Sequence, residues 1–589
     1  MRLASLLLLA LAVGSAADNE RVFLLSLDGF GYQALTKDPA AEGMRFVQRM
    51  RREGVAAPMQ TTFPSVTAAA HASIFTGLDS SENGVTANSV SLRPRSAHRF
   101  DERIIGFRAE QLDREYFWLA WGRAGLRTVA HNTTQGFPCT ANNSGPGTSL
   151  LNGYQTDQVA PEKILHGADV EWLTAAPAGF PALPRSRRPH RIFRYKAGQT
   201  SLTGVVYART KSYDTLRLGV GSGATVDVAV WSAEDEPLDA STRPRALARY
   251  FSPALTLDGD AGVFFRLFEI SKDGKQFLLY QTPAKRISLC DNGPEQAVAA
   301  KQRIYNAAGP FVGNGAGGLY ARGAFGPTMK DGMAERRFLE TLELHARQTQ
   351  RYSEALLNEF SPRLFVDYLS AADDMLHLWW GLSANGESFL DPFRAWGYQI
   401  LDWRVAQLAK LGAPEDHLVV VSDHGMTAMD HELRLNLLLR QWGYRDRVFA
   451  TYFGLFVNTS DWLGGLVKPE QKRALLEEVK AKLAGYRFAG KPLFRAFYWP
   501  EEIQAEYGVG GDRGADLYFD LAPGWSLSMA MEEPVAKALA QPRGEHGPLP
   551  TREDLLAIFL HLGPEIHSRP ARLRTRDVAG YVKRLLGLP

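Results

Sequence analysis

The stretch LVVVSDHG, residues 418–425, joins an uninterrupted apolar run directly to an Asp-His-Gly turn. Such runs without polar alternation are typical of strands that are buried on both faces of a sheet. The arrangement recurs: VFLLSL at 22–27 leads into Asp28, and LFVDYL at 364–369 is followed by Asp373. Helical stretches separate these runs, so the pattern predicts an α/β fold whose mostly parallel central sheet is flanked by helices.

Acidic and imidazole side chains follow all three predicted strands: Asp28 after the first, Asp373 and His377 after the second, Asp423 and His424 after the third. The carboxyl ends of the strands form the binding crevice of an open α/β sheet. A four-residue spacing places Asp373 and His377 on one face of a helix. Taken singly, each motif could be a turn or a surface pair. Together they predict a site for zinc or another divalent metal.

Two further residues are candidates for the same site. His546 stands in GEHGP, residues 544–548, just before the apolar run 555–560. Thr67 stands in TTFPSVTAAAHASIFTG, residues 61–77, where the alanines predict a helix that begins beside it. A hydroxyl at a helix N-terminus is well placed to attack phosphorus, because free backbone N–H groups there favour an anion. On this segment alone, an ordinary helix-capping threonine explains Thr67 equally simply.

Composition narrows the class of protein without naming it. The chain has 589 residues, 45% hydrophobic and 22% charged, which excludes a disordered or coiled-coil protein. Its net charge of +3, from 67 basic and 64 acidic residues, is too small an excess to indicate nucleic-acid binding. Two cysteines, Cys139 and Cys290, exclude a disulfide-rich scaffold. They could pair with each other or remain two buried thiols.

The first residues predict export. Arg2 precedes the apolar run Leu3–Val13, and the small residues 14–17 offer a cleavage site after Ala17. A membrane span needs about 20 apolar residues, and no later segment reaches that length without charges. We therefore expect residues 1–17 to be a signal peptide and the mature protein to be periplasmic or extracellular, with no transmembrane segment.

The sequence pattern changes twice along the chain, and this divides it into three regions after the signal peptide. Residues 18–165 and 316–589 show the alternation of strands and helices that is typical of an α/β domain. Residues 166–315 instead contain short runs of period-two alternation without helices between them. We expect one discontinuous catalytic α/β domain with an inserted, small, sandwich-like β region.

These motifs, in this order, resemble the alkaline phosphatase superfamily, and within it the type I phosphodiesterase/nucleotide pyrophosphatase branch. The resemblance covers roughly residues 20–150 and 330–565. It rests on the following elements: Asp28-Gly29, Pro64-Ser65-x-Thr67 with Thr76-Gly77, Gly84-Val85 followed by Asn88, Asp373-x-x-x-His377, Asp423-His424-Gly425 and Gly544-x-His546-Gly547.

The resemblance implies a site with two zinc ions, although another divalent metal would suit the same ligands. One ion would be held by Asp373, His377 and His546, and the other by Asp28, Asp423, His424 and the bridging Thr67. It also implies that Thr67 forms a phosphothreonine intermediate, while Asn88 and the backbone N–H after Thr67 hold the phosphoryl oxygens. His71 has no ligand role in the family, so we interpret it as structural.

The substrate implied is a small phosphate ester. No Lys-x-Arg pair, as found in monoesterases of this branch, occurs in the stretch 128–135, which favours a phosphodiester or a pyrophosphate over a monoester. Ala68–Ala70 replace the aromatic residue and Asn usual in nucleotide pyrophosphatases, so a nucleotide is not specified. A sulfatase is excluded, because the Cys/Ser-x-Pro-x-Arg motif is missing at Thr67. The alternatives are a phosphomonoesterase, or an exported envelope- or glycan-binding protein with a degenerate hydrolase domain.

Overall fold

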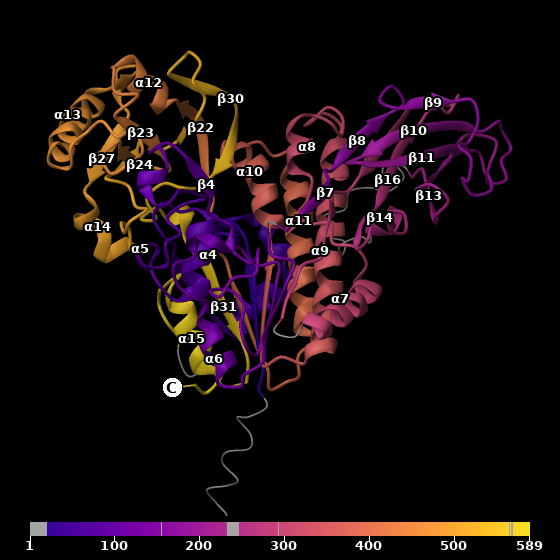
Figure 1. Ribbon diagram of the computed structural model, residues 1–589, viewed down its shortest axis with the longest axis horizontal. Helices are drawn as coiled ribbons and strands as arrows, with labels where there is room; N and C mark the ends of the chain where they lie inside the picture. Colours follow the sequence, from indigo (N-terminus) through magenta and orange to yellow (C-terminus); the bar gives the residue numbers. More distant parts are fainter. Residues whose placement is uncertain are drawn as a thin grey trace, which may run out of the picture.

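The computed structural model describes residues 20–154, 156–231, 247–291, 294–564, 566 and 569–588. The predicted signal peptide, residues 1–17, lies outside this part of the chain. In the described ranges, no helix combines the length and apolar character that a membrane crossing requires. A central sheet lies between two helical layers, and two smaller units project from its upper end on opposite sides (Figure 1).

The central sheet has nine strands and is mostly parallel. β1 lies in the middle, parallel to both of its neighbours, and β31 is antiparallel to both of its own. In spatial order the strands are β19 (Leu289–Cys290), β6 (Thr148–Leu151), β5 (Thr128–His131), β20 (Leu364–Leu369), β1 (Val22–Leu27), β21 (His417–Val421), β31 (Ala557–Leu562), β2 (Val55–Gln60) and β32 (Leu573–Arg574). The predicted α/β fold class is thus confirmed.

The apolar strands are explained by helices on both faces of the sheet. Val22 and Leu24 of β1 pack in one core cluster, while Phe23, Leu25 and Leu27 pack in another on the opposite face. Both faces exclude water, so neither can carry the polar alternation of a half-exposed strand. The helices on the first face are α4 (Thr67–Thr76), α6 (Phe117–Arg123) and α15 (Asp577–Leu585); those on the second are α3 (Arg45–Glu53), α9 (Met333–Phe360), α10 (Ala371–Ala384) and α11 (Asp391–Ala409).

One projecting unit consists of the strands from β7 to β18, residues 158–285, and is called the β insert here. Its two larger antiparallel sheets share one apolar core, as in a β-sandwich. One sheet has the order β13 (Thr225–Ala229), β12 (Thr215–Gly219), β11 (Thr200–Tyr207), β10 (Arg191–Ala197) and β9 (Glu171–Leu173). The other has the order β16 (Phe265–Ile270), β17 (Phe277–Gln281) and β8 (Lys163–His166). Small strand pairs, β14 (Leu255–Asp258) with β15 (Ala261–Val263) and β7 (Gln158–Ala160) with β18 (Ala284–Lys285), complete it.

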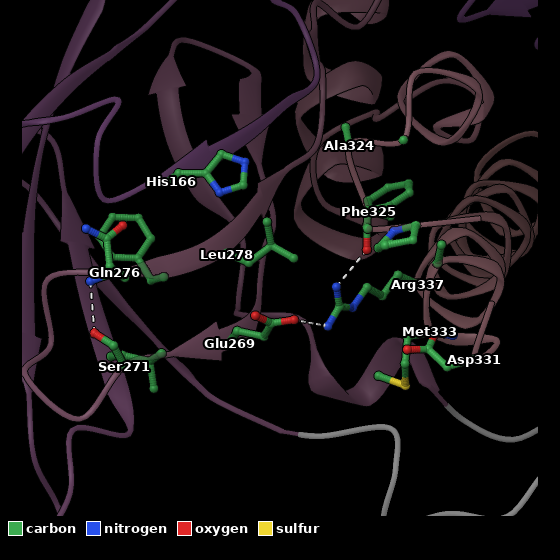
Figure 2. A pocket seen from close by; sticks show the side chains of 16 residues that line it. His166, Glu269, Ser271, Gln276, Leu278, Ala324, Phe325, Asp331, Met333 and Arg337 are labelled. Carbon is green, nitrogen blue, oxygen red and sulfur yellow. Dashed lines mark hydrogen bonds and ion pairs between the residues drawn. The ribbon is translucent and has the colours of Figure 1, made fainter. Parts of the chain in front are cut away.

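Ion pairs fasten the β insert to α9. Arg266 Nε on β16 donates to Glu340 Oε2 over 2.6 Å, and neither side chain is exposed. Arg337 on α9 pairs with Glu269 and donates to the Phe325 carbonyl (Figure 2). A pocket of about 600 Å³ lies at this junction, and none of the predicted site residues line it. Because an unpaired buried charge costs about 3 to 5 kcal/mol, these pairs hold the insert in one orientation.

The second projecting unit, residues 427–545, is called the cap here. The sequence pattern did not distinguish it from the rest of residues 316–589. It has its own apolar core and two sheets. These are β29 (Trp525–Leu527), β22 (Thr427–Leu433) and β30 (Ala536–Glu545), and β23 (Val448–Thr451), β24 (Gly454–Val457), β28 (Leu517–Leu521) and β27 (Phe494–Tyr498), with helices α12 (Leu435–Gln441), α13 (Lys472–Gly485) and α14 (Pro500–Tyr507).

Cys139 and Cys290 form a disulfide with a Cα–Cα distance of 5.7 Å. The bond connects the loop after β5 to the edge strand β19. It therefore closes the chain around the β insert, which lies between the two cysteines in the sequence. Of the two states left open by the sequence, the structure has the paired one.

Candidate active site

The predicted ligands meet at the carboxyl edge of the central sheet. Asp28 follows β1, Asp423 and His424 follow β21, and α10, which follows β20, carries Asp373 and His377. A close backbone approach makes this possible. Gly29 has φ +69°, and a Cβ there would lie 2.8 Å from Asp373 Oδ1, so glycine lets the loop after β1 approach the start of α10.

Asp28, Asp423 and His424 form one ligand group. His424 Nε2 lies 3.0 Å from Asp423 Oδ2 and 3.7 Å from Asp28 Oδ1. One ligand atom from each residue falls within 4.8 Å of the others, which is close enough for a single ion. The second oxygen of each carboxylate is held elsewhere: Asp423 Oδ1 accepts from Gly29 N at 3.0 Å, and Asp28 Oδ2 accepts from the Tyr368 hydroxyl.

Asp373, His377 and His546 form a second group. His377 Nε2 is 3.4 Å from Asp373 Oδ1 and 3.2 Å from His546 Nε2, and His546 Nε2 is 3.8 Å from the same carboxylate oxygen. His424 also lies within reach of Asp373 and His546. Its ring stacks on that of His546 with 3.7 Å between centroids. The structure therefore brings all six predicted ligands into one cluster.

The chemistry of this cluster fits metal binding. Asp28 Oδ1, Asp373 Oδ1 and Asp423 Oδ2 are buried and accept no hydrogen bond within the described part of the chain. These three oxygens are among the ligand atoms whose distances are given above. Buried carboxylate oxygens without donors cost free energy, and a shared cation removes that cost.

The histidines are also oriented for metal binding. The Nδ1–H groups of His377, His424 and His546 donate to the carbonyls of Gly544, Gly425 and Ser65 at 2.9, 3.0 and 2.8 Å. A carbonyl can only accept, so each bond places the proton on Nδ1. The lone pair of each Nε2 then points into the cluster, which is the tautomer that a metal requires.

Burial and neighbouring charges shift the pKa values of the carboxylates and imidazoles in the cluster. Burial and the charge of Asp423 raise the pKa of Asp28 well above its usual value. Burial alone would raise the pKa of Asp423, but the imidazoles of His424 and His71 hold it well below the usual range. Burial lowers the pKa of His546, and neighbouring His424 lowers it further. A divalent cation would neutralise this repulsion.

Thr67 is the first residue of α4, preceded by Val66 in an extended conformation. Val66 is the N-cap residue, so Thr67 does not stand in the capping position. Its Oγ1 instead lies 3.2 Å from His424 Nε2, and the residue is only 5% exposed. The hydroxyl thus faces the ligand cluster at the positive end of a helix, as a nucleophile would.

Asn88 lies beside the same helix end. Its Oδ1 accepts from the backbone N–H of Ala68 at 2.8 Å. The resemblance placed that N–H on the phosphoryl oxygens, whereas here it is already bonded to Asn88. The reason is that first-turn N–H groups have no partner within a helix and take the nearest acceptor. Because this bond uses the amide oxygen of Asn88, its Nδ2 group is the part of the side chain that can donate to a substrate.

Two residues outside the predicted ligand set support the site: His71, which we interpreted as structural, and Tyr368, which the sequence did not single out. His71 Nδ1 donates to the Thr67 carbonyl at 3.0 Å and lies 3.4 Å from Asp423 Oδ2, while its Nε2 is 2.8 Å from Ser26 Oγ. It thereby positions both Thr67 and Asp423. Its spacing of four residues from Thr67 was the available signal. Tyr368 donates its hydroxyl to Asp28, but the sequence pattern indicates only that Tyr368 belongs to the strand β20, not that it contacts the site.

A pocket of about 630 Å³ opens beside the cluster on the side of the cap. Asn88, His377 and His546 line it from the α/β side. Apolar and aromatic residues of the cap form the opposite wall, namely Met429, Phe449, Tyr452, Phe453, Leu527 and Met529. Charged side chains also line it, namely Asp101, Arg103 and Glu545, and the Nε and Nη2 of Arg103 are buried without a hydrogen-bond partner in the described part of the chain. The volume is typical of a small-molecule site.

Comparison with known proteins assigns the family. The model of the type I phosphodiesterase/nucleotide pyrophosphatase family matches residues 22–549. No curated protein matches the chain. Similar solved structures include phosphonoacetate hydrolase from Sinorhizobium meliloti 1021, in complex with phosphonoformate, at 14% identity and a TM-score of 0.48. Human ectonucleotide pyrophosphatase/phosphodiesterase 5 has 13% identity and a TM-score of 0.46. Each alignment covers 97% of this chain and 96% of the other.

The family match spans the β insert, the cap and the strands of the central sheet except β31 and β32, and it contains every ligand of the cluster. The chain belongs to the type I phosphodiesterase/nucleotide pyrophosphatase family of the alkaline phosphatase superfamily, and is therefore a metal-dependent phosphoesterase.

Proposed function

We propose that this protein is an exported two-zinc phosphohydrolase that cleaves phosphodiesters or pyrophosphates through a phosphothreonine on Thr67. The observation that carries the proposal is the position of Thr67 Oγ1, 3.2 Å from His424 Nε2 at the N-terminus of α4. A hydroxyl used only for helix capping would bond to its own first turn instead.

The six residues that would hold the metals are divided between two ions as the resemblance divides them, and His424 lies within reach of both groups. Asp28, Asp423 and His424 would hold one ion, and Asp373, His377 and His546 the other. The mixture of carboxylate oxygens and imidazole nitrogens suits zinc. Two bound ions supply Lewis acidity, which lowers the pKa of a hydroxyl or water and neutralises charge on the reacting oxygens.

The covalent steps belong to Thr67. Its Oγ1 attacks phosphorus in line, forming the Oγ1–P bond as the bond to the leaving alcohol breaks, and the alcohol takes up a proton. Water then attacks phosphorus, the Oγ1–P bond breaks, and Thr67 regains its proton. Asn88 Nδ2 donates to a phosphoryl oxygen in both steps. Two in-line displacements leave the configuration at phosphorus unchanged overall.

The preference for a diester or pyrophosphate rests on the end of β5 and the residues that follow it. His131 bonds to Asp367 at 3.0 Å, and Gln135 bonds to the Gly106 carbonyl at 2.7 Å. These side chains are buried and tie the loop down, so this segment offers no cation to the substrate. A dianionic monoester would need such a cation more than a monoanionic diester does.

Export is supported by two separate features. The apolar run Leu3–Val13 and the small residues after it have the form of a signal peptide. The Cys139–Cys290 disulfide suits an oxidising compartment, because disulfides are rare in the reducing cytosol.

The test is a comparison of two chromogenic esters, bis-p-nitrophenyl phosphate and p-nitrophenyl phosphate, with the purified holoenzyme. We expect faster release of p-nitrophenol from the diester, and loss of release when a chelator removes the metals. A strong preference for the monoester would make the protein a phosphomonoesterase. No chelator-sensitive release from either ester would favour a binding protein with a degenerate hydrolase domain.

A further inference from the structure

One wall of the pocket beside the ligand cluster is a hairpin of two short strands, β3 (Ser89–Ser91) and β4 (Arg103–Ile105). It lies where the cap meets the α/β domain (Figure 1). Asn88 directly precedes β3, and its carbonyl accepts from the N–H of Gly106, just after β4, at 2.8 Å. The hairpin therefore carries both Asn88, which belongs to the proposed chemistry, and Arg103, which does not.

Three contacts hold the guanidinium group of Arg103 in this wall. Its Nη1 donates to the hydroxyl of Ser91, the residue opposite it in the hairpin, at 2.8 Å. Its central carbon lies over two aromatic rings of the cap, 4.0 Å from the centre of Phe456 and 5.4 Å from that of Phe449. A cation is attracted to the face of an aromatic ring, so these contacts fix the plane of the group. Arg103 and Phe449 both line the pocket.

The other edge of the Arg103 guanidinium is the one that binds carboxylates elsewhere in this protein. Its Nε and Nη2 are buried and make no hydrogen bond within the described part of the chain. Arg217 donates from the same two atoms to the two oxygens of Asp227, at 2.8 and 2.9 Å. Arg303 holds Glu359 in the same way. A buried donor without an acceptor costs about 1 to 3 kcal/mol, so this edge is suited to bind a carboxylate or a phosphate through two bonds.

The two acidic residues that line the pocket outside the ligand cluster are paired with other arginines. Asp101 accepts from Nε and Nη2 of Arg99 at 3.1 and 3.3 Å. Glu545 lies 2.9 Å from Nη2 of Arg543. Burial lowers the pKa of Arg103 only to about 10, which leaves the guanidinium protonated at neutral pH. The pocket therefore contains a positive charge that no described carboxylate binds.

Another part of the pocket wall has a strained backbone. Tyr452 and Phe453 form the turn between β23 and β24, with φ angles of +45° and +62°. Such turns usually contain Asn and Gly, because other residues at positive φ cost about 1 to 3 kcal/mol each. Strain of this kind clusters at sites that hold ligands. Tyr452 also packs against Val66 and Ala69, so the turn lies against the start of the helix that carries Thr67.

We propose that Arg103 binds a second anionic group of the substrate, a carboxylate or a phosphate, through its Nε and Nη2. The proposal rests on the proposed function and narrows the class of ester that the pocket accepts. Both nitrogens are buried, so the guanidinium turns slightly toward the pocket when the anion binds. Ser91, which anchors Arg103, follows Asn88 by three residues, or about 10 Å of extended chain. One small substrate can therefore place its phosphoryl group at Asn88 and its second anion at Arg103.

Three phosphonates test the proposal, because their carbon–phosphorus bonds are not hydrolysed and binding alone is measured. Butylphosphonate, 3-carboxypropylphosphonate and propane-1,3-bisphosphonate share a chain of three methylene groups and end in a methyl group, a carboxylate and a second phosphonate. Isothermal titration calorimetry with the metal-loaded protein gives the three Kd values, and metal analysis afterwards controls for chelation. We expect one or both anionic ligands to bind the wild type about tenfold or more tightly than butylphosphonate. The two anionic ligands distinguish a carboxylate site from a phosphate site.

Arg103→Met removes the charge but keeps an unbranched side chain that can pack on the aromatic rings. It should raise the Kd of the preferred anionic ligand about tenfold or more and leave that of butylphosphonate unchanged. Arg487→Met is the matched control, because Arg487 is an exposed arginine of the cap, in β25 (Arg487–Phe488), and should change none of the three values. An equal effect of Arg103→Met on all three ligands, or no wild-type preference for either anion, would overturn the proposal.

Should Arg103→Met not fold, Arg103→Lys decides the matter. Lysine keeps the positive charge but cannot donate two parallel bonds, so the preference for the anionic ligand should fall below that of the wild type. An unchanged preference would contradict binding through Nε and Nη2. Cleavage of bis-p-nitrophenyl phosphate is measured separately on the same wild-type sample. Lack of chelator-sensitive cleavage rejects the proposed function, whereas equal Kd values for the three phosphonates reject the role of Arg103.

Discussion

Thr67 Oγ1 lies 3.2 Å from His424 Nε2, although 357 residues separate them in the chain. Thr67 begins a helix on one face of the sheet, and His424 lies in the loop between β21 and β22. Their contact places a hydroxyl directly against the residues that are predicted to bind metal. The roles proposed for these two residues differ, and they can be tested separately.

Replacing Thr67 with alanine is expected to abolish turnover and leave the metals bound. The change removes the attacking oxygen but none of the six carboxylate and imidazole ligands. By analogy with other covalent nucleophiles, the loss in kcat should be at least about 10³-fold. Steady-state kinetics and metal analysis by mass spectrometry of the same samples check this. A variant that keeps most of its activity at unchanged metal content would show that Thr67 is not the nucleophile.

Replacing His424 with alanine should reduce both the metal content and the rate. His424 contributes to both ligand groups, so its loss weakens each of them. His166→Ala, at an exposed histidine in the β insert, is the matched control and should behave as wild type. Metal stoichiometry after dialysis is the measurement. Wild-type stoichiometry in His424→Ala would refute its assignment as a ligand.

Asp28→Asn is expected to stabilise the metal-free protein while impairing metal loading. Burial and Asp423 raise the pKa of Asp28, so folding disfavours its ionisation. A carboxyl group with a higher pKa in the folded state reduces the free energy of unfolding as pH rises from the unfolded pKa of about 4 towards the folded value. The amide avoids this loss and can donate to the unpartnered Asp423 Oδ2, a gain of about 1 to 3 kcal/mol.

Denaturant unfolding in the presence of chelator, at pH 4.5 and at pH 8, measures the effect of Asp28→Asn. The advantage of the variant over wild type should be small at the lower pH, where Asp28 is protonated, and larger at the higher pH. An advantage that does not grow with pH would mean that repulsion between Asp28 and Asp423 does not destabilise the metal-free fold.

Reducing the Cys139–Cys290 disulfide should destabilise the protein. The bond joins residues 151 apart, and the chain-entropy estimate for a loop of that length is about 4 to 5 kcal/mol. Thermal unfolding with and without reductant is the measurement. The Cys139→Ser/Cys290→Ser double variant should unfold at the temperature of the reduced wild type and be insensitive to reductant. Identical transitions for oxidised and reduced wild type would contradict the estimate.

Local patterns determined the elements of the α/β domain. β1 at Val22–Leu27 and β20 at Leu364–Leu369 have the bounds that the apolar runs predict. These segments are long or uniformly buried, so their apolar pattern is complete within the segment itself. The family also followed from the sequence, because its motifs lie in short loops directly after such strands.

The cap and the pairing of the cysteines depended on tertiary structure. β22 pairs with β30, and the partners Thr427 and Glu545 are more than a hundred residues apart, so no local pattern reports the pairing. The same holds for Cys139 and Cys290, which come together only because β19 lies at the edge of the central sheet.

The sequence by itself determined which residue types stand at the strand ends, and hence that a metal-dependent phosphoesterase was to be expected. Only the tertiary structure decided how they meet: which carboxylate oxygens stay unpartnered, which carbonyls orient the histidines, and that His71 and Tyr368 lie beside the cluster. The physical reason is that these contacts join β1, β20, β21 and the loops around them, whose proximity comes from the strand order of the sheet. Distance along the chain does not report that order.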